Sequence, residues 1–125
     1  MKKRIEKYLP DAISIISEVK IANNDGEVDS KFNGYFSSFG AAIVLSGLKP
    51  ALAFYSNTKT AKERSKILQA VYKLVVNRSE GQDIEAVELL NYYISHENNS
   101  LLKYKILDAA VALKLAVRTY KFKVD

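Results

Sequence analysis

Lysine and arginine side chains at helical spacing are the residues of this sequence whose types and positions best support a chemical role. One set recurs every three or four residues and so shares one face of a predicted helix: Lys59, Lys62, Lys66, Gln69 and Lys73. A second set near the C-terminus, Lys114, Arg118 and Lys121, has similar spacing. At about 1.5 Å per residue the first set extends over about 20 Å, enough to follow several phosphates of a nucleic acid. We expect the basic residues of both sets, here called the first and second basic stripes, to bind the phosphates of a nucleic acid; the alternative is a face that contacts only solvent.

The distribution of charge along the chain supports this interpretation. The net charge is +5. Residues 59–78 contain six Lys or Arg and one acid, and residues 103–123 contain the same numbers of each. Residues 80–97 contain five acids and neither Lys nor Arg. Charge is therefore sorted by segment, and the two basic segments favour an anionic partner.

The remaining ionisable residues form no recognisable catalytic or metal-binding set. His96 is the only histidine and there is no cysteine, so a catalytic triad, a zinc site built on these residues and a disulfide all lack members. Asp83, Glu85 and Glu88 could hold a divalent cation, but acids in the first turn of a helix are explained more simply by the helix dipole. We expect a protein that is not an enzyme and that holds no metal or cofactor.

Apolar residues at helical spacing predict six helices and no strand. The pattern is clearest in the last helix, where such residues recur along the whole length: Leu102, Ile106, Ala109, Leu113, Ala116 and Tyr120. The expected helices are joined by short loops and cover residues 3–22, 30–46, 50–56, 60–77, 83–97 and 101–121. We expect an all-α fold, a compact bundle of about six helices in one domain that covers residues 1–125.

Residues that begin, end or interrupt helices refine this expectation. Pro10 either lies in the first turn of a helix that begins near Leu9 or kinks a longer helix. Asp29 or Ser30 is the expected N-cap of the second helix. Gly47 suits the left-handed position just past the end of that helix.

Two further signals concern the second and fourth helices. Residues 60–63, Thr-Ala-Lys-Glu, form a capping box that opens the fourth helix. Gly40 lies inside the second helix, where glycine costs about 1 kcal/mol relative to alanine. We therefore expect another backbone to pack closely against Gly40.

Signals for export or membrane insertion are incomplete in this sequence. No apolar run approaches the roughly 18 residues of a membrane span. The N-terminus has the positive start of a signal peptide but lacks the apolar stretch and cleavage site that follow in such a peptide. We expect a cytoplasmic protein that does not contact a membrane.

Residues 35–55 carry a resemblance to a known family. This stretch reads Tyr-Phe-Ser-Ser-Phe-Gly-Ala-Ala-Ile-Val-Leu-Ser-Gly-Leu-Lys-Pro-Ala-Leu-Ala-Phe-Tyr. A helix that ends in a Ser-Gly-Leu turn, here residues 46–48, is followed by an apolar helix of the form Leu-Ala-Phe-Tyr, here residues 52–55. In this order and spacing the chain resembles the small helical subunit of the type III-B CRISPR effector, the Cmr complex. Size, the lysine-rich first helix and the helical pattern extend the resemblance over essentially the full length.

The resemblance implies a non-catalytic subunit of a ribonucleoprotein that acts in antiviral defence. Several copies of such a subunit stack head to tail along the guide-bearing backbone, contact other subunits, and help to hold target RNA against the guide RNA. RNA contacts of the family follow no motif that can be transferred to this sequence. The expected role of the basic stripes in RNA binding therefore rests on their spacing alone.

Two other functions remain open from the sequence. The chain could be the equivalent small subunit of the related type III-A complex, which is similar in role and helical content. It could also be a helical adaptor that binds only protein, with its positive charge serving an acidic partner.

Overall fold

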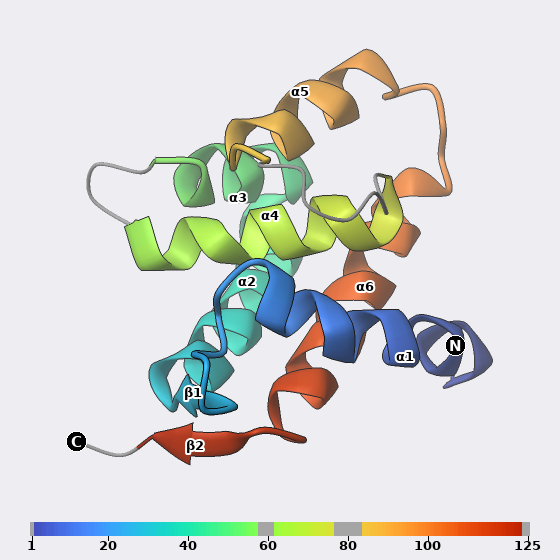
Figure 1. Cartoon of the computed structure of the whole chain (residues 1–125). Coiled ribbons are helices and arrows are strands. Elements are labelled where there is room, and N and C mark those ends of the chain that lie inside the picture. The colour runs from blue at the N-terminus through green and yellow to red at the C-terminus, as the bar shows by residue number, and fades with distance from the viewer. Residues whose placement is uncertain (1, 58–61, 77–83, 124–125) are drawn as a thin grey trace.

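The computed structural model describes residues 2–57, 62–76 and 84–123, and this part of the chain contains six helices (Figure 1). The helices are α1 (Lys2–Glu18), α2 (Lys31–Ser46), α3 (Leu48–Tyr55), α4 (Lys62–Val75), α5 (Val87–Ser95) and α6 (Leu102–Val117). Two strands of three residues each are also described, β1 (Glu27–Asp29) and β2 (Lys121–Lys123). The all-α fold class is confirmed. No helix among the described residues is long and apolar enough to cross a membrane.

Helix α6 lies at the centre of the molecule, because α1, α2 and α4 all pack against it. Its apolar residues are buried at the positions that helical spacing predicts: Leu102, Ile106, Ala109, Leu113 and Ala116. Ala110, Ala112 and Val117 are buried as well. The buried surface is therefore wider than a single stripe, as contact with three neighbouring helices requires.

The aromatic residues of α2 and the short helix α3 complete the core. Buried residues of α2 recur at helical spacing and comprise Phe32, Phe36, Phe39 and Ile43. Helix α3 buries Leu48, Ala51, Leu52 and Tyr55. Helix α5 packs on α3 and α4, and Leu89 is its one fully buried residue. Figure 1 shows α5 at one end of the molecule and the two strands at the other.

Pro10 lies inside α1, which is one helix from Lys2 to Glu18. The alternative in which the helix begins near Leu9 is therefore wrong. A proline at this position removes the backbone hydrogen bond to the carbonyl of Glu6, four residues earlier. Pro10 and Glu6 are both exposed. Water can satisfy that carbonyl, so the helix continues through the proline.

The chain after α6 differs from the sequence prediction. Helix α6 ends at Val117 instead of Lys121, and β2 pairs in parallel with β1, with Val28 opposite Phe122. The Tyr120 hydroxyl donates a hydrogen bond to the carbonyl oxygen of Ile13 at 2.5 Å. The prediction that the chain has no strand is wrong, because three-residue strands are too short to show a period of two.

The ends of α2 follow the capping signals of the sequence. The side chain of Asp29 accepts a hydrogen bond from the Lys31 backbone N–H at 3.0 Å, whereas Ser30 makes no side-chain cap. Gly47 has φ 93° and ψ 162°, and its N–H donates to the Ile43 carbonyl at 3.0 Å. Its positive φ is confirmed, although ψ places it in an extended region that is essentially restricted to glycine. Helix α3 begins directly after Gly47, so Pro50 is its third residue and not its first.

The fourth and fifth helices are shorter in the described structure than the sequence predicts. Helix α4 is described from Lys62, so the capping box of residues 60–63 lies partly outside the described residues. Helix α5 begins at Val87 and ends at Ser95, inside the predicted range of 83–97. Residues 84–86, in the first turn of the predicted range, are therefore not part of the helix.

The environment of Gly40 contradicts its predicted role. A Cβ atom added at Gly40 meets no heavy atom within 4 Å, so no other backbone of the described residues packs against it. Gly40 instead lies beside an apolar groove between α2 and α6. The close packing that the sequence suggested is absent.

We expect Gly40→Ala to raise the free energy of unfolding by about 0.5–1 kcal/mol, because alanine favours a helix and space is available. Gly47→Ala also replaces a glycine by alanine and is therefore the matched comparison. It should lower the free energy of unfolding by about 1–3 kcal/mol, because its φ of 93° with ψ of 162° is strained for any residue with a Cβ. Urea denaturation of both variants measures the contrast. Equal effects at the two glycines would contradict this reading of the backbone.

Candidate nucleic-acid interface

The residues of the first basic stripe differ in their exposure. Lys62 is exposed, Lys66 is half-buried and Lys73 is buried. Lys59 lies outside the described residues. The stripe thus begins on the surface at the N-terminal end of α4 and runs into the space between α4 and the end of α1.

Lys73 forms an ion pair inside the molecule. Its Nζ atom lies 2.9 Å from Oε1 of Glu18, and the exposed fractions of the two side chains are 4% and 28%. The prediction that Lys73 lies on an exposed stripe is therefore wrong. Leu68 and Val71, on the opposite face of α4, are buried as well. The sequence did not show that α1 covers the lysine face as well, because that contact joins residues 55 positions apart.

The end of α1 has the hydrogen bonds of a Schellman motif. The Ile21 N–H donates to the Ile16 carbonyl at 3.0 Å, and the Lys20 N–H donates to the Ser17 carbonyl at 3.1 Å. Lys20 occupies the left-handed position of the motif, with φ 63°. This position normally holds glycine. Lys20 is the one described non-glycine residue with a positive φ.

A cavity of about 320 Å³ lies between this turn and α4. Four of its lining residues have cationic or amide side chains and one has a carboxylate: Lys20, Lys66, Gln69, Lys73 and Glu18. We call these five residues and the space between them the lysine hollow. The Lys66 Nζ donates a hydrogen bond to the Lys20 carbonyl at 3.3 Å. Lys20 was not part of the predicted stripe, because no helical spacing connects it with α4.

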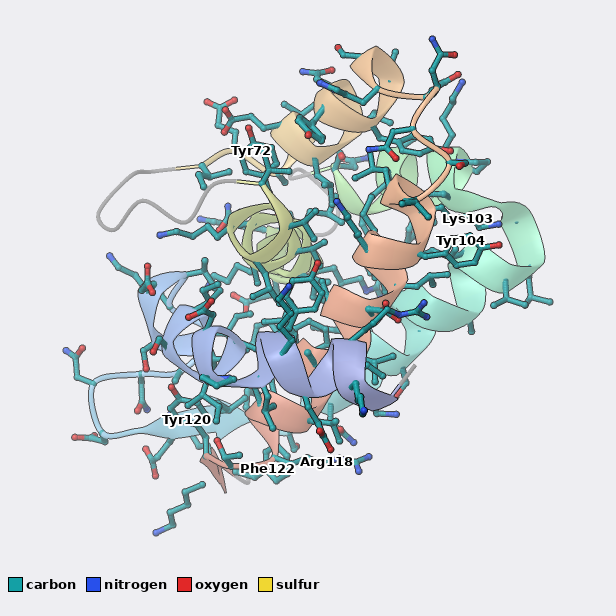
Figure 2. The ribbon with its side chains drawn as sticks, turned by 90° about the vertical axis from the view of Figure 1, so that its right-hand side faces the viewer. Tyr72, Lys103, Tyr104, Arg118, Tyr120 and Phe122 are labelled. Atoms are coloured by element: carbon teal, nitrogen blue, oxygen red, sulfur yellow. The ribbon has the colours of Figure 1, made fainter. Side chains whose placement is uncertain are left out.

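The second basic stripe does not remain on one helix face. Lys114 is half-buried beside the groove between α2 and α6, and Arg118 follows the last residue of α6, with its Nε 3.4 Å from Oδ1 of Asn33. Lys121 lies in β2, where its Cα is paired with that of Glu27. Figure 2 shows Lys103 and Tyr104 near the start of α6, and Arg118 at the opposite end of the helix near Phe122. The stripe is divided because the helix ends before Lys121.

A cationic residue that the spacing missed lies on the other side of α4. The Arg64 guanidinium carbon is 5.3 Å from the ring centre of Tyr35 and 6.0 Å from that of Phe54. Phe54 is 58% exposed. Burial raises the pKa of the neighbouring Tyr55, and the Arg64 charge opposes that rise. Cation–aromatic contacts of this kind support stacking on a base or on a protein side chain equally well.

The groove between α2 and α6 is apolar. Its lining includes Gly40, Ala41, Leu107 and Val111, with Lys114 at one end. Val111 is also partly exposed to solvent, and so are other large apolar residues of the same two helices: Val44, Leu45, Tyr104 and Leu115. The sequence offered a signal for this surface, since the apolar residues of α6 are too many for one buried stripe. Large apolar side chains that are exposed together on one surface are typical of protein–protein contact.

The acidic residues and the histidine serve local structure. The Glu88 carboxylate accepts a hydrogen bond from the Glu85 N–H at 2.6 Å, which caps the start of α5. Asp83 lies outside the described residues. Nδ1 of His96 lies 2.8 Å from the Tyr92 carbonyl, and its ring stacks on that of Tyr92 at 4.0 Å. No group of three potential metal ligands occurs in the described ranges.

One further ion pair joins α3 to the loop after α5. The Lys49 Nζ lies 2.6 Å from Oε1 of Glu97. This hydrogen bond raises the pKa of Lys49. The acid at the end of the acidic segment is therefore paired within the molecule.

These observations define a small, basic, helical protein whose described ionisable groups make ion pairs and local hydrogen bonds. The family model described as CRISPR-associated protein (Cas_Cmr5) matches residues 5–119. The chain belongs to this family, and it is a Cmr5-type small subunit of the type III-B CRISPR effector complex. The resemblance carried by residues 35–55 is thereby confirmed, in favour of type III-B. No curated protein and no solved structure gave a significant match.

The buried ion pair generates a stability prediction. Glu18→Ala should lower the free energy of unfolding by about 3 kcal/mol, because it leaves the Lys73 ammonium buried without its carboxylate. Adding Lys73→Met should restore most of that loss, since an apolar side chain of similar size needs no counter-charge. Chemical denaturation of the single and double variants measures both effects.

Lys31→Ala is the control for this prediction. It removes a lysine whose ion pairs with Asp29 and Glu63 are long, at 3.6 and 3.9 Å, and partly exposed. Its effect should stay below about 1 kcal/mol. A Glu18→Ala effect no larger than that of Lys31→Ala would show that the buried pair contributes little.

Proposed function

We propose that this chain is a non-catalytic subunit that helps to hold target RNA against the guide in a type III-B effector. The family match over residues 5–119 carries the proposal, since it makes the chain a subunit of a CRISPR effector complex. The proposed setting is the cytoplasm, where antiviral RNA recognition would take place.

RNA contact is assigned to the basic residues that the fold leaves accessible. Lys62 and Arg118 are exposed, and Lys66 and Lys114 are half-buried at the edges of hollows. Lys121 is exposed but lies opposite Glu27, so its charge is partly compensated. Lys59 retains its proposed role from spacing alone. Lys73 supports this surface from below by positioning the end of α1 against α4.

Contact with neighbouring subunits is assigned to the apolar surface of α2 and α6. Val44 and Leu45 are 79% and 84% exposed, which is unusual for large apolar side chains. We propose that this surface contacts the next copy of the chain when copies stack head to tail. Other subunits of the complex are the remaining partners. The same exposed surface favours the second candidate function, an adaptor that binds protein without RNA.

The double variant Lys62→Glu/Arg118→Glu tests the RNA contact in the reconstituted complex. Phosphate contacts release counterions when RNA binds. The logarithm of the binding constant should therefore fall linearly with the logarithm of the salt concentration, with a slope of about 0.7 in magnitude for each contact on a single strand. The variant should lower this slope by about 1.4 if both residues contact phosphate. The loss should be similar for unrelated RNA sequences, because phosphate contacts carry no base information. Filter binding or fluorescence anisotropy across a salt series measures the slope.

Lys3→Glu/Lys105→Glu is the matched control, because it makes the same charge change at two exposed positions. It should change the slope less than the test variant. If the test variant assembles normally and holds RNA with unchanged affinity and slope, the adaptor function is the better account.

A further inference from the structure

We propose that the lysine hollow is a binding site for a phosphate group. The group could belong to the RNA backbone or to a free phosphorylated molecule. The RNA form of this proposal rests on the function proposed above, whereas the site itself does not. The argument uses the charge in the hollow, the geometry of its lysines and the conformation of Lys20.

The hollow has an excess of positive charge. Three lysines, Lys20, Lys66 and Lys73, line the hollow together with one described residue that carries a carboxylate, Glu18. The C-terminal end of α1 adds the equivalent of about half a negative charge. The described lining residues therefore carry an excess of about one and a half positive charges. An anion with one or two charges would match that excess.

Two of the lysines are held in place before any ligand binds. The Glu18 carboxylate fixes Lys73 at 2.9 Å, and the Lys20 carbonyl fixes Lys66 at 3.3 Å. Gln69 lies between them on α4 and contributes an amide to the same wall. Ordered donors lose little conformational entropy when they bind. A cavity of about 320 Å³ also leaves room for a phosphate with its water, since one water occupies about 30 Å³ of liquid.

A purely structural role accounts for Lys66 and Lys73 but not for Lys20. Lys73 could serve only to pair with Glu18, and Lys66 could serve only to bind the Lys20 carbonyl after the end of α1. The cap at Lys20 is made by backbone hydrogen bonds, so it does not need a lysine side chain. A lysine is nevertheless present where φ is 63° and glycine is favoured. Strained positions of this kind are concentrated at functional sites. A ligand for the Lys20 ammonium explains why the strain is kept.

Lys20→Gly separates binding from stability. Glycine relieves the positive φ, so the variant should unfold at a higher urea concentration than the parent. The same variant should bind pyrophosphate at least fivefold more weakly, because one of three ammonium groups is lost. Titration of the full chain with pyrophosphate at low salt, followed by NMR shifts of the Gln69 side-chain amide, measures the affinity. A residue with only a structural role would not lose binding while it gains stability.

Glu18→Gln tests the opposite change, an increase in the affinity for pyrophosphate. It removes the one carboxylate of the hollow, so it should destabilise the fold and yet tighten pyrophosphate binding at least twofold. Lys66→Gln should weaken binding, whereas the exposed control Lys105→Gln should not. The proposed site is overturned if pyrophosphate binding to the parent protein does not saturate. It is also overturned if Lys66→Gln and Lys105→Gln lower the affinity for pyrophosphate equally.

Competition identifies the source of the phosphate. Single-stranded RNA should displace pyrophosphate if the backbone of RNA occupies the hollow, and Lys20→Gly should then weaken RNA retention by the complex. If RNA does not compete, the site takes a free phosphorylated molecule. Lys62→Glu/Arg118→Glu lies outside the hollow and should leave pyrophosphate binding unchanged. Failure of the RNA function and failure of the phosphate site are thereby distinguished.

Discussion

Burial of α6 against three other helices is the interaction on which the rest of the structure depends. Its alanines at 109, 110, 112 and 116 are all buried, so α1, α2 and α4 can approach its axis closely. The end of α6 also places Tyr120 on α1 and β2 beside β1. Both the apolar groove and the position of Arg118 follow from this arrangement. A larger residue at any of these buried alanines would disturb the packing of a neighbouring helix on α6.

The ion pair between Glu18 and Lys73 links this core to the candidate site. It joins α1 to α4 inside the molecule, and the same contact orders one wall of the lysine hollow. A buried pair of this kind contributes modestly to net stability but is costly to break on one side. It therefore defines where the end of α1 lies relative to α4. The proposed phosphate site depends on that relation, because Lys20 follows α1 and Lys66 belongs to α4.

The sequence predicted the helices well and the site only in part, for physical reasons. Long amphipathic patterns identified α2, α4 and α6, and the turn at Gly47 was recognised from its residue type. Spacing within a helix could not show that Lys73 is buried, because its partner Glu18 is 55 residues away. The hollow places Lys20, which lies in a turn, beside α4. No periodicity in the sequence predicts that arrangement. Gly40 was misread because the glycine faces a groove and not another backbone.

Isolation of the native complex through a tag on this chain tests the central claim most directly. The chain is a Cmr subunit, and the function proposed for it is to help hold RNA within the assembled effector. Native mass spectrometry of the purified material should show the other Cmr subunits, more than one copy of this chain, and a bound guide RNA. Recovery of the chain as a free monomer, or with partners that include neither Cmr subunits nor RNA, would contradict the account.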